Sequence, residues 1–156
     1  ICGLTYTVDE RVVSESPDLF EGVRYVNAFK TFQGALDSGG MGADIIKENF
    51  EREGRDMDNP EVAQLNYVRG VIHALLALKG LQNTIDAGNE VTGANARQGM
   101  FDIQDDNMEG LAQPYTFNED DRRQTMTGRL FEVTDGSLSF DTTVELPRRD
   151  DWIGNC

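Results

Sequence analysis

Hydrophobic and polar residues recur with two different periods along the chain, and each period predicts one kind of element. Residues 1–7 are rich in β-branched and aromatic side chains, and apolar residues alternate with polar ones over 23–29, so both stretches predict β-strands. Asp9 is placed to cap a short helix that ends at Ser16, because Pro17 follows directly.

Helical spacing dominates the middle of the chain. Residues 43–53 predict a surface helix that Gly54 ends. With Asn59 as N-cap, a second apolar stripe predicts one continuous helix to about Leu81. Gly70 lies inside this helix, and since glycine costs roughly 1 kcal/mol in a helix interior, it predicts close approach by a neighbouring element. The stripe consists of Val62, Leu65, Val68, Ile72, Leu75, Leu76 and Leu78.

The rest of the pattern predicts one helix, two irregular segments and a hairpin. Residues 31–42 are glycine-rich and predict a loop, whereas 92–101 predict a helix capped by its threonine. Residues 105–121 are polar and predict an extended connection. The β-rich runs within 125–146 flank Asp135–Gly136, which is a strong hairpin signal.

Composition is that of one folded domain with an acidic surface. A chain of 156 residues, 38% of them hydrophobic, can bury a core. The longest apolar stretch, 71–78, is far shorter than the roughly 20 residues that span a bilayer. From Ile1 onward no targeting signal is visible. The net charge of −14, from 28 acidic and 14 basic residues, argues against a nucleic-acid partner, which requires clustered Lys and Arg.

No arrangement of residues predicts catalysis. His73 is the single histidine and lies in the middle of the long predicted helix, so we expect it on the helix surface or packed there. The chain contains none of the motifs GxSxG, HExxH, CxxC, GxGxxG or a P-loop. The acidic pairs Asp105–Asp106, Asp120–Asp121 and Asp150–Asp151 could ligate a hard cation, but solvated loops are the better interpretation. We therefore expect no enzyme, no metal and no cofactor.

The two cysteines, Cys2 and Cys156, lie at opposite ends of the sequence. Their spacing matches neither a metal site nor a redox motif. They could form one disulfide bond, or they could be two unpaired thiols with Cys2 buried as a small hydrophobic residue.

Five short stretches carry a resemblance to a known family through their order and spacing. They are Ile1–Thr7, Leu19–Val26 with its Glu-Gly-Val, Tyr67–Val71, Val91–Met100 and Gly110–Arg122. Together they resemble the second half of type I solute-binding proteins of the branched-chain amino-acid, amide and aromatic-compound group, which capture ligands for ABC importers. Within the last stretch, Asp121 stands where that pattern often has histidine.

The resemblance implies an α/β fold that is the C-terminal portion of a two-lobed type I periplasmic-binding-protein fold. It assigns 1–22 to lobe two, 23–134 to lobe one, and 135–156 to a return to lobe two. The implied function is binding of a small amide, carboxylate, aromatic compound or amino acid between hinged lobes. The implied partners are that small-molecule solute and an ABC permease in the membrane, in a periplasmic or other extracytoplasmic location. The alternative is a solute-sensing receptor or regulatory domain of the same fold.

The resemblance also implies four ligand-binding residues. Thr5 falls where family members that bind amino acids have an acidic residue, and its lack of charge favours an amide, a carboxylate or an aromatic compound. Tyr6 could stack on or hydrogen-bond to the ligand, or simply pack at a strand end. Glu61 and Val62 begin the long helix where some relatives contact ligand. Because both chain ends would belong to lobe two, the two cysteines could be neighbours, and export would favour their oxidation.

Overall fold

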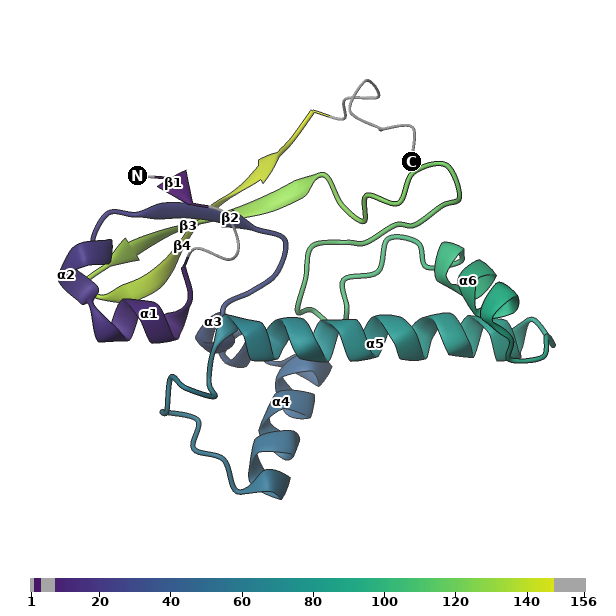
Figure 1. The fold of residues 1–156 in the computed structure, drawn as a ribbon, viewed down its shortest axis with the longest axis horizontal. Helices are drawn as coiled ribbons and strands as arrows, with labels where there is room; N and C mark the ends of the chain where they lie inside the picture. Colours follow the sequence, from purple (N-terminus) through teal and green to yellow (C-terminus); the bar gives the residue numbers. More distant parts are fainter. Residues whose placement is uncertain (1, 4–7, 148–156) are drawn as a thin grey trace.

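The structure, a computed structural model, describes residues 2–3 and 8–147 of the chain and is mixed α/β. Helices follow each of the first two strands, and two consecutive strands end the described chain (Figure 1). In chain order they are β1 (Cys2–Gly3), α1 (Glu10–Glu15), α2 (Pro17–Phe20), β2 (Arg24–Asn27), α3 (Phe32–Asp37), α4 (Gly40–Glu53), α5 (Leu65–Asp86), α6 (Gly93–Phe101), β3 (Thr127–Thr134) and β4 (Ser137–Glu145).

A four-stranded sheet of order β1-β2-β3-β4 joins the two ends of the described chain. β1 is parallel to β2, and the other two pairings are antiparallel. The register between β2 and β3 places Tyr25 opposite Phe131, and their rings stack with centroids 5.0 Å apart. The β-strands expected at 1–7 and 23–29 are therefore present as β1 and β2, with 4–7 outside the described residues.

The predicted hairpin is confirmed. β3 and β4 pair over their whole lengths, with one irregularity next to Phe131. Asp135 and Gly136 form the turn with φ of 51° and 70°, which is the left-handed backbone that a two-residue turn of type I′ requires. The turn lies beside the start of β2, because Gly22 N–H donates to the carbonyl of Val133 at 2.9 Å.

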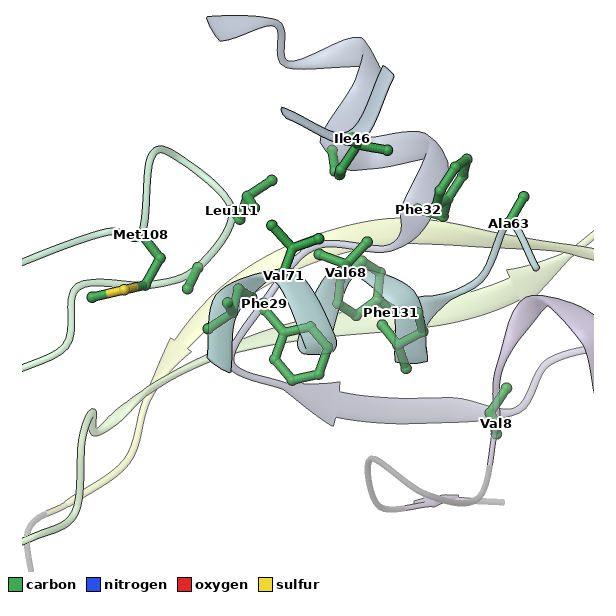
Figure 2. Packing of buried hydrophobic residues seen from close by; sticks show 14 of the residues in the cluster. Val8, Phe29, Phe32, Ile46, Ala63, Val68, Val71, Met108, Leu111 and Phe131 are labelled. Carbon is green, nitrogen blue, oxygen red and sulfur yellow. The ribbon is translucent and has the colours of Figure 1, made fainter. Parts of the chain in front are cut away.

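The core lies between the sheet and α5, with α4 on the side of α5 away from the sheet and α3 in contact with both helices (Figure 1). The helical spacing of the apolar residues on α5 places Leu65, Val68 and Ile72 on one face, and all three are fully buried. Figure 2 shows Val68 and Val71 of α5 in one cluster with Phe131 of β3 and Ile46 of α4. Most of the stripe found in the sequence therefore packs in or against the core, but Leu78 is 62% exposed, so its expected place in the stripe is wrong.

Three of the predicted helices and their caps are confirmed. Asp9 caps α1 by accepting from the Val12 N–H at 3.0 Å. α4 ends at Gly54, whose φ of 62° is left-handed. Thr92 caps α6 by accepting from the Asn95 N–H at 3.3 Å. The polar connection after α6 contains no further helix among its residues 105–121, as expected.

The prediction of a loop over residues 31–42 is wrong, because most of this segment is helical. α3 occupies Phe32–Asp37, and α4 begins at Gly40, three residues earlier than expected. Thr31 caps α3 by accepting from the Gly34 N–H at 3.1 Å, and Phe32 and Ala35 are buried. Burial of these two residues outweighs the unfavourable helix propensity of the glycines.

The long helix starts later than expected. Asn59 begins only a single helical turn, in which its carbonyl accepts from the Ala63 N–H at 2.8 Å. The backbone is extended at Gln64, and α5 then runs unbroken from Leu65 to Asp86. The expected start at Asn59 is therefore wrong by six residues, and the helix passes its expected end at Leu81 by five residues.

The close helix contact lies near Gly80 rather than at Gly70. Nothing lies within 4 Å of the position that a Cβ on Gly70 would take, so the expectation of a close approach there is wrong. A methyl group on Gly99 of α6 would instead overlap the Gly80 carbonyl oxygen. The two helices are also joined by Thr84, whose hydroxyl donates to Gly80 O at 2.9 Å and Asn95 O at 3.1 Å.

Two expectations concern the ends of the chain and the membrane. Cys156 lies outside the described residues, so the disulfide with Cys2 stays a prediction. Over residues 2–3 and 8–147, no helix combines the length and the apolar character needed to cross a bilayer.

Substituting the two glycines should have opposite effects on stability. Gly99→Ala should lower the free energy of unfolding by about 1–3 kcal/mol, because the added methyl forces α5 and α6 apart. Gly70→Ala should raise it by roughly 0.5–1 kcal/mol, since the space is open and alanine is the better helix former. Urea unfolding of both variants checks this, and equal stabilities would contradict it.

Candidate functional site

The carboxylate of Glu10 joins three helices at their N-terminal ends. Glu10 is the first residue of α1. One of its oxygens accepts from the Phe32 N–H at the start of α3 (2.8 Å), and the other accepts from the Leu65 N–H at the start of α5 (2.6 Å). The residues from 8 onward are thereby fixed against segments that follow 22 and 55 positions later. We refer to this arrangement as the Glu10 junction.

At the starts of α3 and α5, one backbone N–H group has no acceptor within its own helix and donates to Glu10 instead. The first N–H groups of a helix have no partner inside the helix, and the positive end of the helix dipole favours an anion. Gln64 precedes α5 with extended backbone and no side-chain capping bond, so Leu65 depends on an acceptor from elsewhere. Thr31 caps α3 through Gly34, which leaves Phe32 for Glu10.

Asp9 adds a second link to α5. One oxygen of Asp9 caps α1, and the other accepts from the Asn66 side-chain amide at 3.3 Å. Two consecutive acidic residues thus bind the first two residues of α5. The start of α1 is therefore held at the N-terminus of α5 by two hydrogen bonds.

Burial changes the protonation of groups at the junction. Desolvation raises the pKa of Glu10 above its ordinary value of 4.5, and it outweighs the backbone hydrogen bonds that act in the opposite direction. Burial also raises the pKa of Tyr25, with Glu10 and Asp9 adding to the effect by charge repulsion. The Tyr25 hydroxyl is buried and has no hydrogen-bond partner among the described residues.

Aromatic side chains hold α3, α4 and α5 together below the junction. Phe50 of α4 lies 5.1 Å from Phe32 and 4.8 Å from Tyr67, measured between ring centroids. The Phe50–Tyr67 pair meets edge to face at 77°, a favourable geometry for aromatic pairs. Because Phe32 also donates its N–H to Glu10, this packing fixes the direction of that hydrogen bond.

A pocket of about 340 Å³ lies between the Glu10 junction and the hairpin turn. Its volume is at the lower end of the range typical of small-molecule sites, about 300–1,000 Å³. Glu10, Thr31 and Gln33 supply its polar groups from α1 and α3, and the hairpin supplies Ser137. Val13, Gly136 and Leu138 complete its lining.

The structure does not test the expected ligand-binding role of the four residues, but it places two of them. Thr5 and Tyr6 lie outside the described residues. Glu61 is exposed, and Val62 is half-buried against the core in the turn before α5. Neither of the latter two lines the pocket beside the junction. The assignment of ligand binding to these four residues stays a prediction.

Other polar residues that the sequence marked have structural partners. Lys79 bridges Asp106 and Glu109, each at 2.8 Å. Asp121, which is buried, pairs with Arg123 at 2.8 Å. No group of three or more His, Cys, Asp or Glu side chains within residues 8–147 is arranged to hold a metal ion.

His73 is exposed on α5 at the rim of the most spacious of the described pockets. This pocket of about 380 Å³ lies between the end of β2, α5 and the connection before β3. Its walls combine apolar side chains such as Ile72 and Leu76 with Arg69. The position of His73 agrees with the surface location that the sequence predicts.

Solved structures match this arrangement of elements. No family model and no curated protein matches the sequence. A branched-chain amino acid ABC transporter from Thermus thermophilus, solved with bound valine, matches with a TM-score of 0.70 and 15% identity, over 90% of this chain and 37% of that one. An ABC transporter substrate-binding protein from Aeropyrum pernix matches with a TM-score of 0.72 and 15% identity, over 97% of this chain and 39% of that one.

The chain has the fold of part of an ABC-transporter substrate-binding protein. The α/β class and the partial type I periplasmic-binding-protein fold that the sequence predicts are confirmed. The chain spans less than two-fifths of the length of either neighbour. The match therefore shows the fold, and the activity and partners of a whole solute-binding protein can only be proposed for this chain.

Within this solute-binding-protein fold, Glu10 is the residue that sequence reasoning missed. The sequence shows an acidic residue in the first turn of a helix, which is ordinary. Its contacts with α3 and α5 depend on tertiary placement, and no local signal reports them. Only the extended Gln64 and the uncapped start of α5 could have hinted that an acceptor from elsewhere was needed.

Removing the Glu10 carboxylate should destabilise the fold. Glu10→Ala leaves the Phe32 and Leu65 N–H groups without acceptors, at a cost of about 1–3 kcal/mol for a buried unsatisfied donor. Glu15→Ala is the matched control, because it removes a carboxylate from the same helix that forms only an exposed pair with Arg11. Urea unfolding at pH 4.5 should show the loss for Glu10→Ala alone, and equal losses would contradict the junction.

The difference in stability between the wild type and Glu10→Ala should also depend on pH. Because the folded-state pKa of Glu10 is raised, its contribution to stability is fully present below about 4.5 and is lost as pH rises through the folded-state pKa. The stability difference between wild type and Glu10→Ala should therefore narrow as pH increases from 4.5. A difference that widens with pH would show that the hydrogen bonds outweigh burial.

Proposed function

We propose that this chain forms part of the extracytoplasmic solute-binding subunit of an ABC importer, which captures a small solute between two hinged lobes. The observation that carries the proposal is the fold match to ABC-transporter binding proteins at TM-scores of 0.70 and 0.72. The order of five sequence stretches, found without the structure, supports the same conclusion. In this role the solute is released unchanged, so we assign no catalytic residue, no metal and no cofactor.

We propose that the lobe boundaries fall near residues 22 and 134, where the chain crosses between lobes. Two backbone hydrogen bonds support this. Val133 accepts from Gly22 at 2.9 Å and donates its own N–H to Val23 at 2.9 Å. Two connections that lie side by side are what a hinge needs if both are to bend together. On this proposal 1–22 and 135–156 belong to lobe two and 23–134 to lobe one.

The solute class follows from the charges near the junction. Thr5 carries no charge, and both oxygens of Glu10 already accept backbone N–H groups. Neither of these two residues therefore offers a free carboxylate to the ammonium group of an α-amino acid. This favours an amide, a carboxylate or an aromatic compound. Branched-chain amino acids belong among the solutes to be tested, because the Thermus thermophilus neighbour was solved with valine.

The partners of this function are the small-molecule solute and an ABC permease in the membrane. The proposed location is periplasmic or otherwise extracytoplasmic. The acidic chain, with a net charge of −14, is poorly suited to nucleic acid. Delivery of solute to the permease depends on closure of the two lobes around it.

A solute screen with a variant at Val62 tests the proposal. The natural polypeptide that contains residues 1–156 should show a raised melting temperature with at least one amide, aromatic acid or branched-chain amino acid. Titration calorimetry with that solute should show at least a tenfold loss of affinity for Val62→Arg, because the charge enters the expected ligand-contacting turn.

Val91→Arg is the matched control, since Val91 is 55% exposed and lies beyond the far end of α5. It should leave the affinity unchanged. If Val62→Arg does not fold, Val62→Thr keeps the side-chain shape and should give a smaller loss. A protein that binds none of these solutes, or a folded Val62 variant with wild-type affinity, would contradict the proposal.

A further inference from the structure

Two positive side chains share a small pocket between α3 and the β3–β4 hairpin. Lys30 precedes α3, and Arg129 lies on β3. The pocket has a volume of about 190 Å³ and is separate from the larger space beside Glu10, although both include Thr31, Gln33 and Leu138. Its full lining is Lys30, Thr31, Gln33, Gly34, Asp37, Arg129, Phe131, Leu138 and Phe140.

Neither cation has an acidic partner among the residues that the structure describes. The salt bridges found between residues 8 and 147 involve other arginines and Lys79. The Nε atom of Arg129 is buried without a hydrogen-bond acceptor in this part of the chain. Burying a charge without a partner costs free energy, so an anion in the pocket would relieve that cost.

The pKa shifts of Lys30 and Arg129 agree with this partly buried environment. Burial lowers the pKa of Arg129 below its ordinary value. Burial, followed by repulsion from Arg129, lowers the pKa of Lys30. Each cation is therefore partly removed from water, and the two are close enough to repel one another. In a chain with twice as many acidic as basic residues, this pairing of unsatisfied cations is unexpected.

Aromatic rings hold the guanidinium group of Arg129 in place. Its central carbon lies 4.2 Å from the centroid of the Phe140 ring and 5.9 Å from that of Phe131. The two rings pack against each other at 69°. Cation–π contacts of this kind fix the plane of the guanidinium, so a bound anion would meet donors already oriented.

The remaining polar groups are engaged within the protein. Gln33 donates to Asp37 at 2.6 Å along α3, and Thr31 accepts from Gly34. Asp37 forms no salt bridge with Lys30 or Arg129 in the described structure. With two cations and one acidic residue in its lining, the pocket keeps a net positive charge.

Size and lining indicate the class of anion. The volume lies below the range of about 300–1,000 Å³ for typical ligand sites, so only a small molecule fits. Phe131, Leu138 and Phe140 form an apolar wall beside the cations, and the Arg129 guanidinium lies against the Phe131 and Phe140 rings. A carboxylate on a short apolar group matches both surfaces, and arginine binds carboxylates through two parallel hydrogen bonds. Phosphate would leave polar oxygens against the aromatic wall.

We propose that Lys30 and Arg129 form a binding site for a small organic carboxylate, whose charged group meets the two cations and whose apolar part contacts Phe131, Leu138 and Phe140. The site lies on described residues of this chain and does not depend on the proposed transport function. Its failure would leave the solute-binding proposal untouched.

Amide chemical shifts measured by NMR on residues 1–156 at constant ionic strength test the site. Isobutyrate should shift the amides of Lys30, Gly34 and Arg129 along a saturating curve. Isobutyramide has the same shape without the charge and should not. Inorganic phosphate should bind more weakly than isobutyrate. Tighter binding of phosphate would overturn the assignment to carboxylates.

Two charge-matched variants complete the design. Lys30→Gln should weaken isobutyrate binding at least fivefold, whereas Lys47→Gln, the same change at an exposed position on α4, should have no effect. Arg129→Lys keeps the charge but removes the planar fork, and should also weaken binding. Equal effects of the two glutamine variants, or equal shifts with isobutyramide, would overturn the proposal. Thermal melting checks that each variant is folded.

Discussion

The half-buried carboxylate of Glu10 joins the starts of three helices of this chain. Glu10 accepts hydrogen bonds from the first N–H groups of α3 and α5, which no residue of their own helices could satisfy. The core then forms around these fixed starts. Phe32 and Leu65, whose N–H groups bind Glu10, are themselves buried. Polar capping and apolar packing therefore act on the same two residues.

The junction also links the fold to its proposed use. It holds Asp9 and Glu10 at the start of α5, and the expected ligand-binding residues Glu61 and Val62 lie in the turn directly before that helix. Sites that bind small molecules need groups from distant parts of the sequence held in fixed positions. In the proposed lobe assignment the chain crosses between lobes near Gly22 and Val133, where two backbone hydrogen bonds join the two connections.

The sequence predicted the elements whose signals are local and missed those that depend on distant partners. Asp135–Gly136 predicted the hairpin, and Thr92 predicted the start of α6, because turn and capping chemistry act within a few residues. Asn59 was a correct signal for one helical turn, but Glu10 moved the start of α5 to Leu65. For the same reason the carboxylate pocket could not be predicted, since Lys30 and Arg129 meet only when β3 pairs with β2.

Hydrogen bonds to the Glu10 carboxylate can be observed directly by NMR. A scalar coupling measured across a hydrogen bond connects the amide nitrogen of the donor with the carboxylate carbon of the acceptor. The structure predicts such couplings from both Phe32 and Leu65 to the side-chain carboxylate of Glu10. If both amides are coupled to other acceptors, the carboxylate does not join α3 to α5, and the account of how this fold is assembled is wrong.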